Sequence, residues 1–187
     1  GDRTGTDTDE GWRAVPNAVG IDHHHVPVPD EDEQLDDYTK IIQASPRHRV
    51  TIRTLDIGGD KTVPYLGHSH QEANPFLGWR SIRLSFEHPE FFITQIRAIL
   101  RAAAAMEEGQ PQVQLMCPMI TTLEEMRRVR GMVRRARRQL SAEGKPYREI
   151  PVGMMLEVPA AAVSIDTILD VVDFVSIGSN DLVQYLM

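Results

Sequence analysis

The sequence predicts an α/β fold built around a parallel sheet, and three observations support this. Short apolar runs alternate with longer segments of helical periodicity along most of the chain. Several of these runs are almost continuously apolar, as strands buried on both faces are. Polar residues follow the ends of three runs, at Asp56, at Glu157 and at Asn180 with Asp181. Because catalytic groups gather at the carboxyl ends of the strands in a (β/α)₈ barrel, the sequence favours a barrel over an open sheet.

The amino-terminal part of the chain divides into a tail and the start of a domain. Residues 1–28 are rich in Gly, Asp, Thr and Pro, and we interpret them as a flexible linker or tail. Residues 29–187 then form the domain. The acidic segment from Asp30 to Asp37 favours the start of a short helix that continues to Ile42. The segment from Val50 to Ile57 alternates apolar and β-branched residues, which predicts the first strand.

The order of a strand followed by a helix then recurs. We expect further strands at 79–84, 113–119, 152–158 and 174–177, with helices at 89–106, 123–140 and 160–169. These elements make up about the first five units of a (β/α)₈ TIM barrel, so we expect an incomplete barrel that ends in a truncated segment at Met187.

The composition excludes several classes of protein. The 187 residues are 41% hydrophobic and 25% charged, which suits one globular domain. A net charge of −7 argues against a nucleic-acid partner. A single cysteine and the lack of a signal-like start favour the cytoplasm. No apolar run approaches the roughly 20 residues of a membrane span, so we expect no membrane partner.

Two carboxylates are candidates for binding a metal ion. Glu157 interrupts an apolar run, where a buried charge is costly without a partner. Asp181 stands at the equivalent position one unit later. Two converging carboxylates with open coordination positions suit Mg²⁺, which retains water and ligand oxygens. In the alternative interpretation Glu157 pairs with an arginine and Asp181 caps a helix, and the residues alone leave both open.

Two arginines are candidates for binding an anion. Arg53 and Arg80 each lie in a predicted strand among apolar neighbours. The planar donors of a guanidinium match a phosphate or a carboxylate, so these residues point to an anionic ligand. Buried salt bridges are the alternative for each arginine.

Four other features carry weaker signals. The histidines 23–25 lie in the predicted tail, and we interpret them as solvated. Residues 58–61, Gly-Gly-Asp-Lys, lack the spacing of a phosphate-binding loop and predict a turn. The arginines between Arg127 and Arg138 lie above an apolar helix face and are interpreted as a solvated helix surface. Cys117 is expected to be a core residue rather than a nucleophile.

Five strings, in order, resemble signatures of the C-terminal domain of enzyme I, the phosphoenolpyruvate-protein phosphotransferase family. They are TIRTLDIGGDK (51–61), NPFLGWRSIR (74–83), CPMI (117–120), GMMLEVPAAA (153–162) and SIGSNDLVQY (176–185). The resemblance covers about residues 30–187 and does not include the first 28.

The resemblance implies a phosphoenolpyruvate-binding barrel of the phosphoenolpyruvate/pyruvate type. By similarity, Arg53 and Arg80 would bind the phosphate of phosphoenolpyruvate and Asn180 would donate a hydrogen bond to it. Glu157 and Asp181 would ligate Mg²⁺.

The resemblance also implies partners and a missing catalytic group. The barrel of this family passes the phosphoryl group to a histidine on a separate N-terminal domain, and from there to a histidine phosphocarrier protein. The full-length parent is expected to be a homodimer. The family cysteine that protonates the enolate lies beyond Met187, so we expect no catalytic residue in this chain and no turnover by it alone. Val183 stands where threonine is frequent in the family, and Ala73 where glutamate is common.

Two alternatives remain open at the level of sequence. Pyruvate phosphate dikinase and phosphoenolpyruvate synthase have similar barrels, although the strings DIGGDK and NPFLGWR favour enzyme I. The chain could instead be a non-catalytic binding module. The sequence does not separate a parent that serves sugar transport from one in nitrogen regulation.

Overall fold

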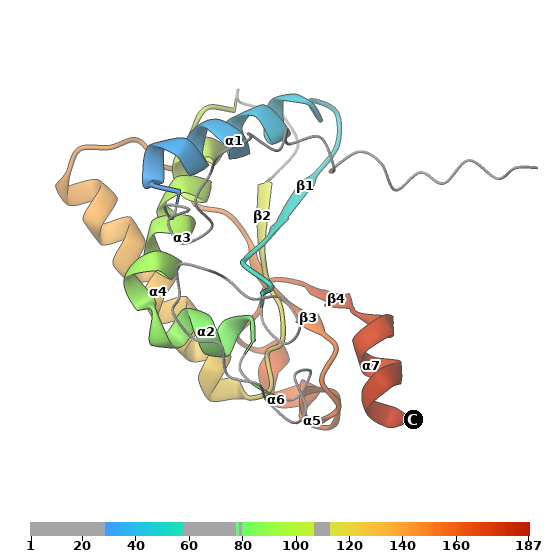
Figure 1. The fold of residues 1–187 in the computed structure, drawn as a ribbon. Helices are drawn as coiled ribbons and strands as arrows, with labels where there is room; N and C mark the ends of the chain where they lie inside the picture. Colours follow the sequence, from blue (N-terminus) through green and yellow to red (C-terminus); the bar gives the residue numbers. More distant parts are fainter. Residues whose placement is uncertain (1–28, 58–77, 79, 107–112) are drawn as a thin grey trace, which may run out of the picture.

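The computed structural model describes residues 29–57, 78, 80–106 and 113–187. Within them, four strands form one parallel sheet in the order β1-β2-β3-β4. The strands are β1 (Val50–Arg53), β2 (Val113–Cys117), β3 (Val152–Leu156) and β4 (Val175–Ile177). Figure 1 shows that the sheet is curled, as in half of a barrel. The predicted α/β class with a parallel sheet is therefore confirmed. The predicted tail, residues 1–28, lies outside the described residues.

Helices separate the strands and cover the sheet. They are α1 (Glu31–Gln43), α2 (Ile82–Glu87), α3 (Pro89–Ala104), α4 (Leu123–Ala142), α5 (Pro159–Val163), α6 (Ile165–Leu169) and α7 (Ser179–Leu186). In Figure 1, α3 and α4 lie along one side of the sheet, whereas α7 follows β4 at the opposite side of the view. None of the helices in the described part of the chain combines the length and apolarity needed to cross a membrane.

The register of the sheet aligns the carboxyl ends of the strands. Arg53 at the end of β1 pairs with Met116, and Leu156 at the end of β3 pairs with Ile177. Because all pairings are parallel, the segments after the four strands meet at one edge of the sheet. We call this edge the rim; it comprises the residues that directly follow Arg53, Cys117, Leu156 and Ile177.

The core that fixes the rim lies between the sheet and the helices α3 and α4. Leu115 of β2 and Met154 of β3 are fully buried, and Phe92 and Ile96 of α3 and Met126 of α4 are buried with them. Burying side chains of this size is the main stabilising contribution to such a fold. The strand ends are thus held by a packed core.

Two helices begin with reciprocal capping. Thr122 accepts a hydrogen bond from the Glu125 N–H at 3.2 Å, and Glu125 reaches back to the Thr122 N–H at 3.1 Å. Asp30 and Glu33 make the same arrangement at the start of α1. Each cap satisfies backbone donors that a helix leaves open. The helix predicted from the acidic segment 30–37 to Ile42 and the helix predicted at 123–140 are both confirmed.

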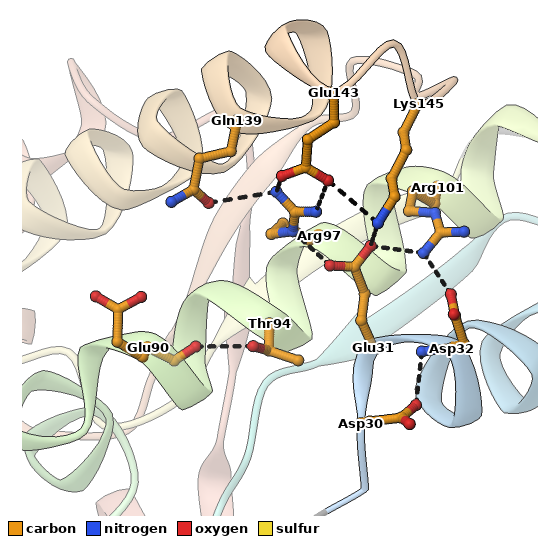
Figure 2. Close-up of polar contacts among 10 residues, drawn as sticks. All are labelled: Asp30, Glu31, Asp32, Glu90, Thr94, Arg97, Arg101, Gln139, Glu143 and Lys145. Carbon is orange, nitrogen blue, oxygen red and sulfur yellow. Dashed lines mark hydrogen bonds and ion pairs between the residues drawn. The ribbon is translucent and has the colours of Figure 1, made fainter.

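A network of charged side chains attaches α1 to α3 and α4 (Figure 2). Arg97 of α3 lies 2.5 Å from Glu31 of α1 and 2.6 Å from Glu143, which follows α4. Arg101 lies 2.5 Å from Glu31, and Lys145 lies 3.5 Å from the same carboxylate. The side chain of Arg97 is only 9% exposed. Its charge is thus compensated from two other segments.

One predicted strand is wrong. Residues 79–84 were expected to be extended, but Arg80 forms only an isolated bridge and α2 begins at Ile82. A segment of six residues is too short for the spacing of its apolar side chains to distinguish a strand from a short helix. In the structure Ile82 and Ser85, one helical turn apart, are both buried. The described sheet therefore has four strands rather than five.

One predicted helix is divided. The segment 160–169 forms α5 and α6, with a break at Ser164. The Ser164 hydroxyl donates a hydrogen bond to the carbonyl oxygen of Ala160 at 2.8 Å, an interaction that competes with regular helix geometry. Residues after the last strand, expected to be a truncated segment, form α7.

Candidate functional site

Four charged side chains form a chain of ion pairs at the rim. Arg80 lies 3.1 Å from Asp181 and 3.4 Å from Asp56, and Asp56 also lies 3.1 Å from Arg53. The side chains of Arg80 and Asp56 are 12% and 13% exposed, whereas that of Arg53 is 46% exposed. Segments more than 100 residues apart in the sequence thus place two cations and two anions side by side.

The backbone after Arg80 is strained in a way that fixes this arginine. Ser81 has a φ of 53°, in the left-handed region that costs a residue with a side chain about 1 to 3 kcal/mol. Its N–H donates to the Ile57 carbonyl oxygen at 2.8 Å, and its hydroxyl bonds to Asp56. Burial lowers the pKa of Arg80, but Asp56 and Asp181 outweigh this effect, so that the pKa is raised. Arg80 therefore stays charged.

Glu157 lies directly after β3 and is almost completely buried, with 1% of its surface exposed. Its Oε1 accepts a hydrogen bond of 2.6 Å from the N–H of Met119, a residue with a φ of 57°. Burial raises the pKa of Glu157, the Met119 N–H opposes this, and the negative charges of Asp181 and Asp56 add to the rise. A carboxylate in this environment favours a proton or a cation.

Gly178 allows the turn from β4 into α7 to pass close to this carboxylate. A Cβ atom at position 178 would lie 2.7 Å from both Cβ and Oε2 of Glu157. Real Cβ atoms do not approach so closely, so a larger residue would displace either the turn or the carboxylate. Glu157 is thus held between Met119 and Gly178.

The structure brings together four of the five residues for which the sequence predicts a binding role. Asp56 joins Arg53 to Arg80, and Arg80 pairs directly with Asp181. The charges of Asp181 and Asp56 act on Glu157. The fifth residue, Asn180, is exposed in the first turn of α7.

The alternatives that the sequence left open are decided only in part. The predicted helix cap by Asp181 is not seen, because Gly178 is the N-cap of α7 and Asp181 pairs with Arg80 instead. The alternative for the arginines was a buried salt bridge. Both form salt bridges, but only that of Arg80 is largely buried, because the side chain of Arg53 is 46% exposed. An arginine in a salt bridge can still bind a ligand, so the pairing by itself does not decide the role.

Comparison with known protein families shows to which family the chain belongs. A family model described as PEP-utilising enzyme, PEP-binding domain, matches residues 21–187. The chain belongs to this family. Similar proteins named phosphoenolpyruvate-protein phosphotransferase include those of Listeria monocytogenes, 45% identical over 160 residues, and Bacillus subtilis, 44% identical over 161 residues. The alignments cover 85% and 86% of this chain and 27% of each relative, so the chain spans about a quarter of the length of these relatives.

These comparisons confirm the resemblance to enzyme I that the five strings indicated. The relatives from Listeria monocytogenes and Bacillus subtilis bear the name of the phosphotransferase rather than of a dikinase or a synthase. Enzymes of the PEP-utilising family use a metal ion, and the carboxylates at the rim of this domain can be tested for such a role.

The rim residues of this PEP-binding domain fit a metal ion for which the protein supplies only some of the ligands. Among the residues that the structure describes, no group of three or more His, Cys, Asp or Glu side chains converges on a common point. Glu157 and Asp181 nevertheless lie close enough for the charge of one to raise the pKa of the other. One or two carboxylates, with water and substrate oxygens completing the shell, is the arrangement in which proteins usually hold Mg²⁺.

Sequence reasoning missed several residues of the site. It placed Asp56 at the rim but gave it no binding role, although Asp56 joins the two arginines. Ser81, Met119 and Gly178 shape the site through backbone geometry, for which the sequence gives no signal apart from the glycine itself. Tyr185 of α7 also lies within reach of the site, because Arg80 and Asp181 act on its pKa, which burial raises.

The prediction for Cys117 is confirmed. The thiol is fully buried at the end of β2, and burial raises its pKa to about 12. A thiol that stays protonated at neutral pH is a poor nucleophile. Cys117 is therefore a core residue.

Proposed function

We propose that this domain binds phosphoenolpyruvate together with Mg²⁺ at the rim, as the phosphoryl-donor half of an enzyme I-type phosphotransferase. The observation that carries the proposal is the partly buried Arg80, which pairs with Asp181 and Asp56 at the rim, where Arg53 and Glu157 also lie. In a family of PEP-utilising enzymes, such a cluster combines the groups that an anion and its metal ion require.

The anion would be bound by the arginines. Phosphoenolpyruvate carries a phosphate and a carboxylate, and each matches the paired donors of a guanidinium. Arg53 is half exposed and can turn toward a ligand, whereas Arg80 is held in place by two aspartates. Asn180, exposed next to Asp181, would donate a hydrogen bond to the phosphate.

The metal ion would be bound by Glu157 and Asp181. When bound there, Mg²⁺ would neutralise the negative charge that develops on the phosphoryl oxygens during transfer. Glu157 is suited to this role because its burial and its acidic neighbours disfavour an unpaired negative charge. Its remaining oxygen, Oε2, is kept close to the turn at Gly178.

Binding would exchange one ion pair for two. Arg80 and Asp181 are partners at 3.1 Å. An anion bound by Arg80 and a cation bound by Asp181 would each replace that contact with one to the ligand. The affinities for substrate and metal would therefore be linked, each raising the other.

The remaining parts of the reaction belong to the whole parent protein. The phosphoryl group would pass to a histidine on a separate domain and then to a histidine phosphocarrier protein, in a cytoplasmic homodimer whose barrel is closed. The name of the relatives supports only the transfer of a phosphoryl group from phosphoenolpyruvate to a protein. The apolar surface on β4 and α7, where Ile177 is 70% and Leu186 69% exposed, supports the closed barrel. Further β/α units packed there would bury these side chains.

The proposal is tested by measuring phosphoryl transfer from labelled phosphoenolpyruvate to the histidine domain. The parent protein should become labelled in the presence of Mg²⁺, and the Asp181→Asn variant should lose most of this label. Tight substrate binding without any labelling of the parent would instead identify a non-catalytic binding module.

A further inference from the structure

A cavity lies outside the rim, on the surface of α4. Its volume is about 350 Å³, and it is lined by Arg134, Arg137, Arg138, Ser141 and Tyr147. We call it the arginine pocket. The first four residues belong to α4, at spacings of three, four and seven that place them on one helix face. Tyr147 closes the pocket from the segment after the helix, with its hydroxyl 3.1 Å from that of Ser141.

The lining combines three positive charges with two hydroxyl groups and no carboxylate. Among the lining residues, only Arg137 forms an ion pair with an acid in the described part of the chain, and this acid, Glu149, does not line the pocket. Within the part of the chain that the structure describes, Arg134 and Arg138 form no ion pair. The whole sequence has a net charge of −7, so the charge of this pocket opposes that of the molecule.

The pocket is remote from the rim. Helix α4 begins at Leu123, soon after the rim end of β2, and its 20 residues span about 30 Å. The arginines of the pocket lie in its second half, toward the opposite end of the sheet. A ligand there would not contact Arg53 or Arg80.

We propose that the arginine pocket binds a phosphate-bearing small molecule at a site separate from the rim. Guanidinium groups at these spacings can surround a phosphate, and the two hydroxyls add neutral donors. The concave shape and a volume within the range of small-molecule sites favour a compact ligand over a flat macromolecular surface. The proposal does not depend on the rim binding phosphoenolpyruvate.

The test is a calorimetric titration of the chain with inorganic pyrophosphate at low ionic strength. The double variant Arg134→Gln/Arg138→Gln should weaken binding by about tenfold or more, because it removes two charge-assisted contacts. The matched control Arg127→Gln/Arg135→Gln changes the charge of the same helix equally but lies outside the pocket, and should stay within about twofold of the unmodified chain. All four side chains are exposed, so the fold should be retained.

A third variant distinguishes this site from the rim. Arg53→Gln should leave pyrophosphate binding at the arginine pocket unchanged. Loss of binding in Arg53→Gln, equal weakening by the two double variants, or no saturable binding to the unmodified chain would each overturn the proposal.

Discussion

Burial and neighbouring negative charges both act on the side chain of Glu157. It is almost fully buried, it accepts one backbone hydrogen bond from Met119, and two aspartates raise its pKa further. Such a carboxylate is costly to keep ionised when no cation is bound. A bound metal ion would remove this cost, because its positive charge would stabilise the ionised carboxylate.

The first prediction concerns stability without metal. In the folded state the pKa of Glu157 is raised above its ordinary value of 4.5, so the folded protein holds this proton at a pH where the unfolded chain has lost it. The stabilising effect is complete below pH 4.5 and declines as the pH rises through the folded pKa. At pH 7.5, with a chelator present, Glu157→Gln should therefore raise the free energy of unfolding by about 1 to 3 kcal/mol.

Thermal unfolding between pH 5 and pH 8 measures this effect. The Glu157→Gln variant should lose less stability over that range than the unmodified chain. Asp37→Asn, a control at a carboxylate that is 75% exposed on α1, should not change the profile. A profile that is identical for the Glu157→Gln variant and the unmodified chain would show that the glutamate is ionised without penalty.

The second prediction separates the two arginines. Arg53→Gln changes a half-exposed side chain, so the free energy of unfolding should change by less than about 0.5 kcal/mol while the affinity for phosphoenolpyruvate falls about tenfold. Arg80→Gln leaves Asp56 and Asp181 without their shared cation and should also destabilise the fold, by about 2 kcal/mol. Urea unfolding and titration with phosphoenolpyruvate, done on both variants, test this difference between the two arginines. Equal losses of stability in the two variants would contradict it.

At the scale of elements, the turn between β4 and α7 sets the position of the site. It brings Asp181 to Arg80 and passes over Glu157 at a distance that only glycine at position 178 allows. The site therefore depends on how a helix meets a strand as much as on its charged residues.

The third prediction compares two glycines. Gly178→Ala places a Cβ atom 2.7 Å from Glu157 and should destabilise the protein by about 1 to 3 kcal/mol and weaken Mg²⁺ binding. Gly131→Ala, in the middle of α4, meets no atom closer than 3.8 Å and should stabilise the protein by about 1 kcal/mol. Chemical unfolding gives the sign of the change in the free energy of unfolding for each variant. A stabilised Gly178→Ala variant would contradict the close approach of Gly178 to Glu157.

The fourth prediction concerns the attachment of α1. Arg97 lowers the pKa of Glu143 to about 2, and the pKa of Glu31 is lowered by Arg97 and Arg101 despite the opposing effect of its burial. These carboxylates thus stabilise the fold above pH 4.5, and the effect is lost as the pH falls toward 2. Glu31→Gln should cost about 1 to 2 kcal/mol at pH 7 and flatten the acid limb of the stability profile.

Unfolding of this variant measured from pH 7 down to pH 2 provides the check. The exposed substitution Asp37→Asn on the same helix serves as the control. If Glu31→Gln leaves the acid limb as steep as in the unmodified chain, the network shown in Figure 2 does not stabilise the contact between α1 and α3.

The sequence predicts a helix or strand well where apolar residues recur regularly over many residues or where a capping residue marks its start. The helix at 123–140 has both an apolar face and a reciprocal cap at Thr122, and the structure confirms it. The segment 79–84 is too short to reveal its period, and Ser164 divides a helix through a local hydrogen bond. The carboxylates of the site could be anticipated because they follow apolar runs, and the arginines because they interrupt predicted strands. The left-handed backbone at Met119 could not, because it arises from tertiary contacts.

At the scale of the whole molecule, the sheet offers two open edges, β1 and β4, among the described residues. Unpaired edges of this kind favour association with further strands, either in the parent barrel or between copies of the chain. Exposed apolar side chains beside β4, such as Val183 at 50% exposure, also favour such association. The binding site at the rim draws on all four strand ends, so its precision depends on how firmly these edges are held.

The most direct test of the account is a titration of the chain with phosphoenolpyruvate in the presence and absence of Mg²⁺. If Arg80 and Asp181 exchange their ion pair for contacts with the two ligands, Mg²⁺ should tighten phosphoenolpyruvate binding about tenfold, and phosphoenolpyruvate should tighten Mg²⁺ binding by the same factor. Glu157→Gln should abolish this linkage and leave weak, metal-independent binding. An affinity for phosphoenolpyruvate that is the same with and without Mg²⁺, in the unmodified chain, would contradict the central claim that one site holds both.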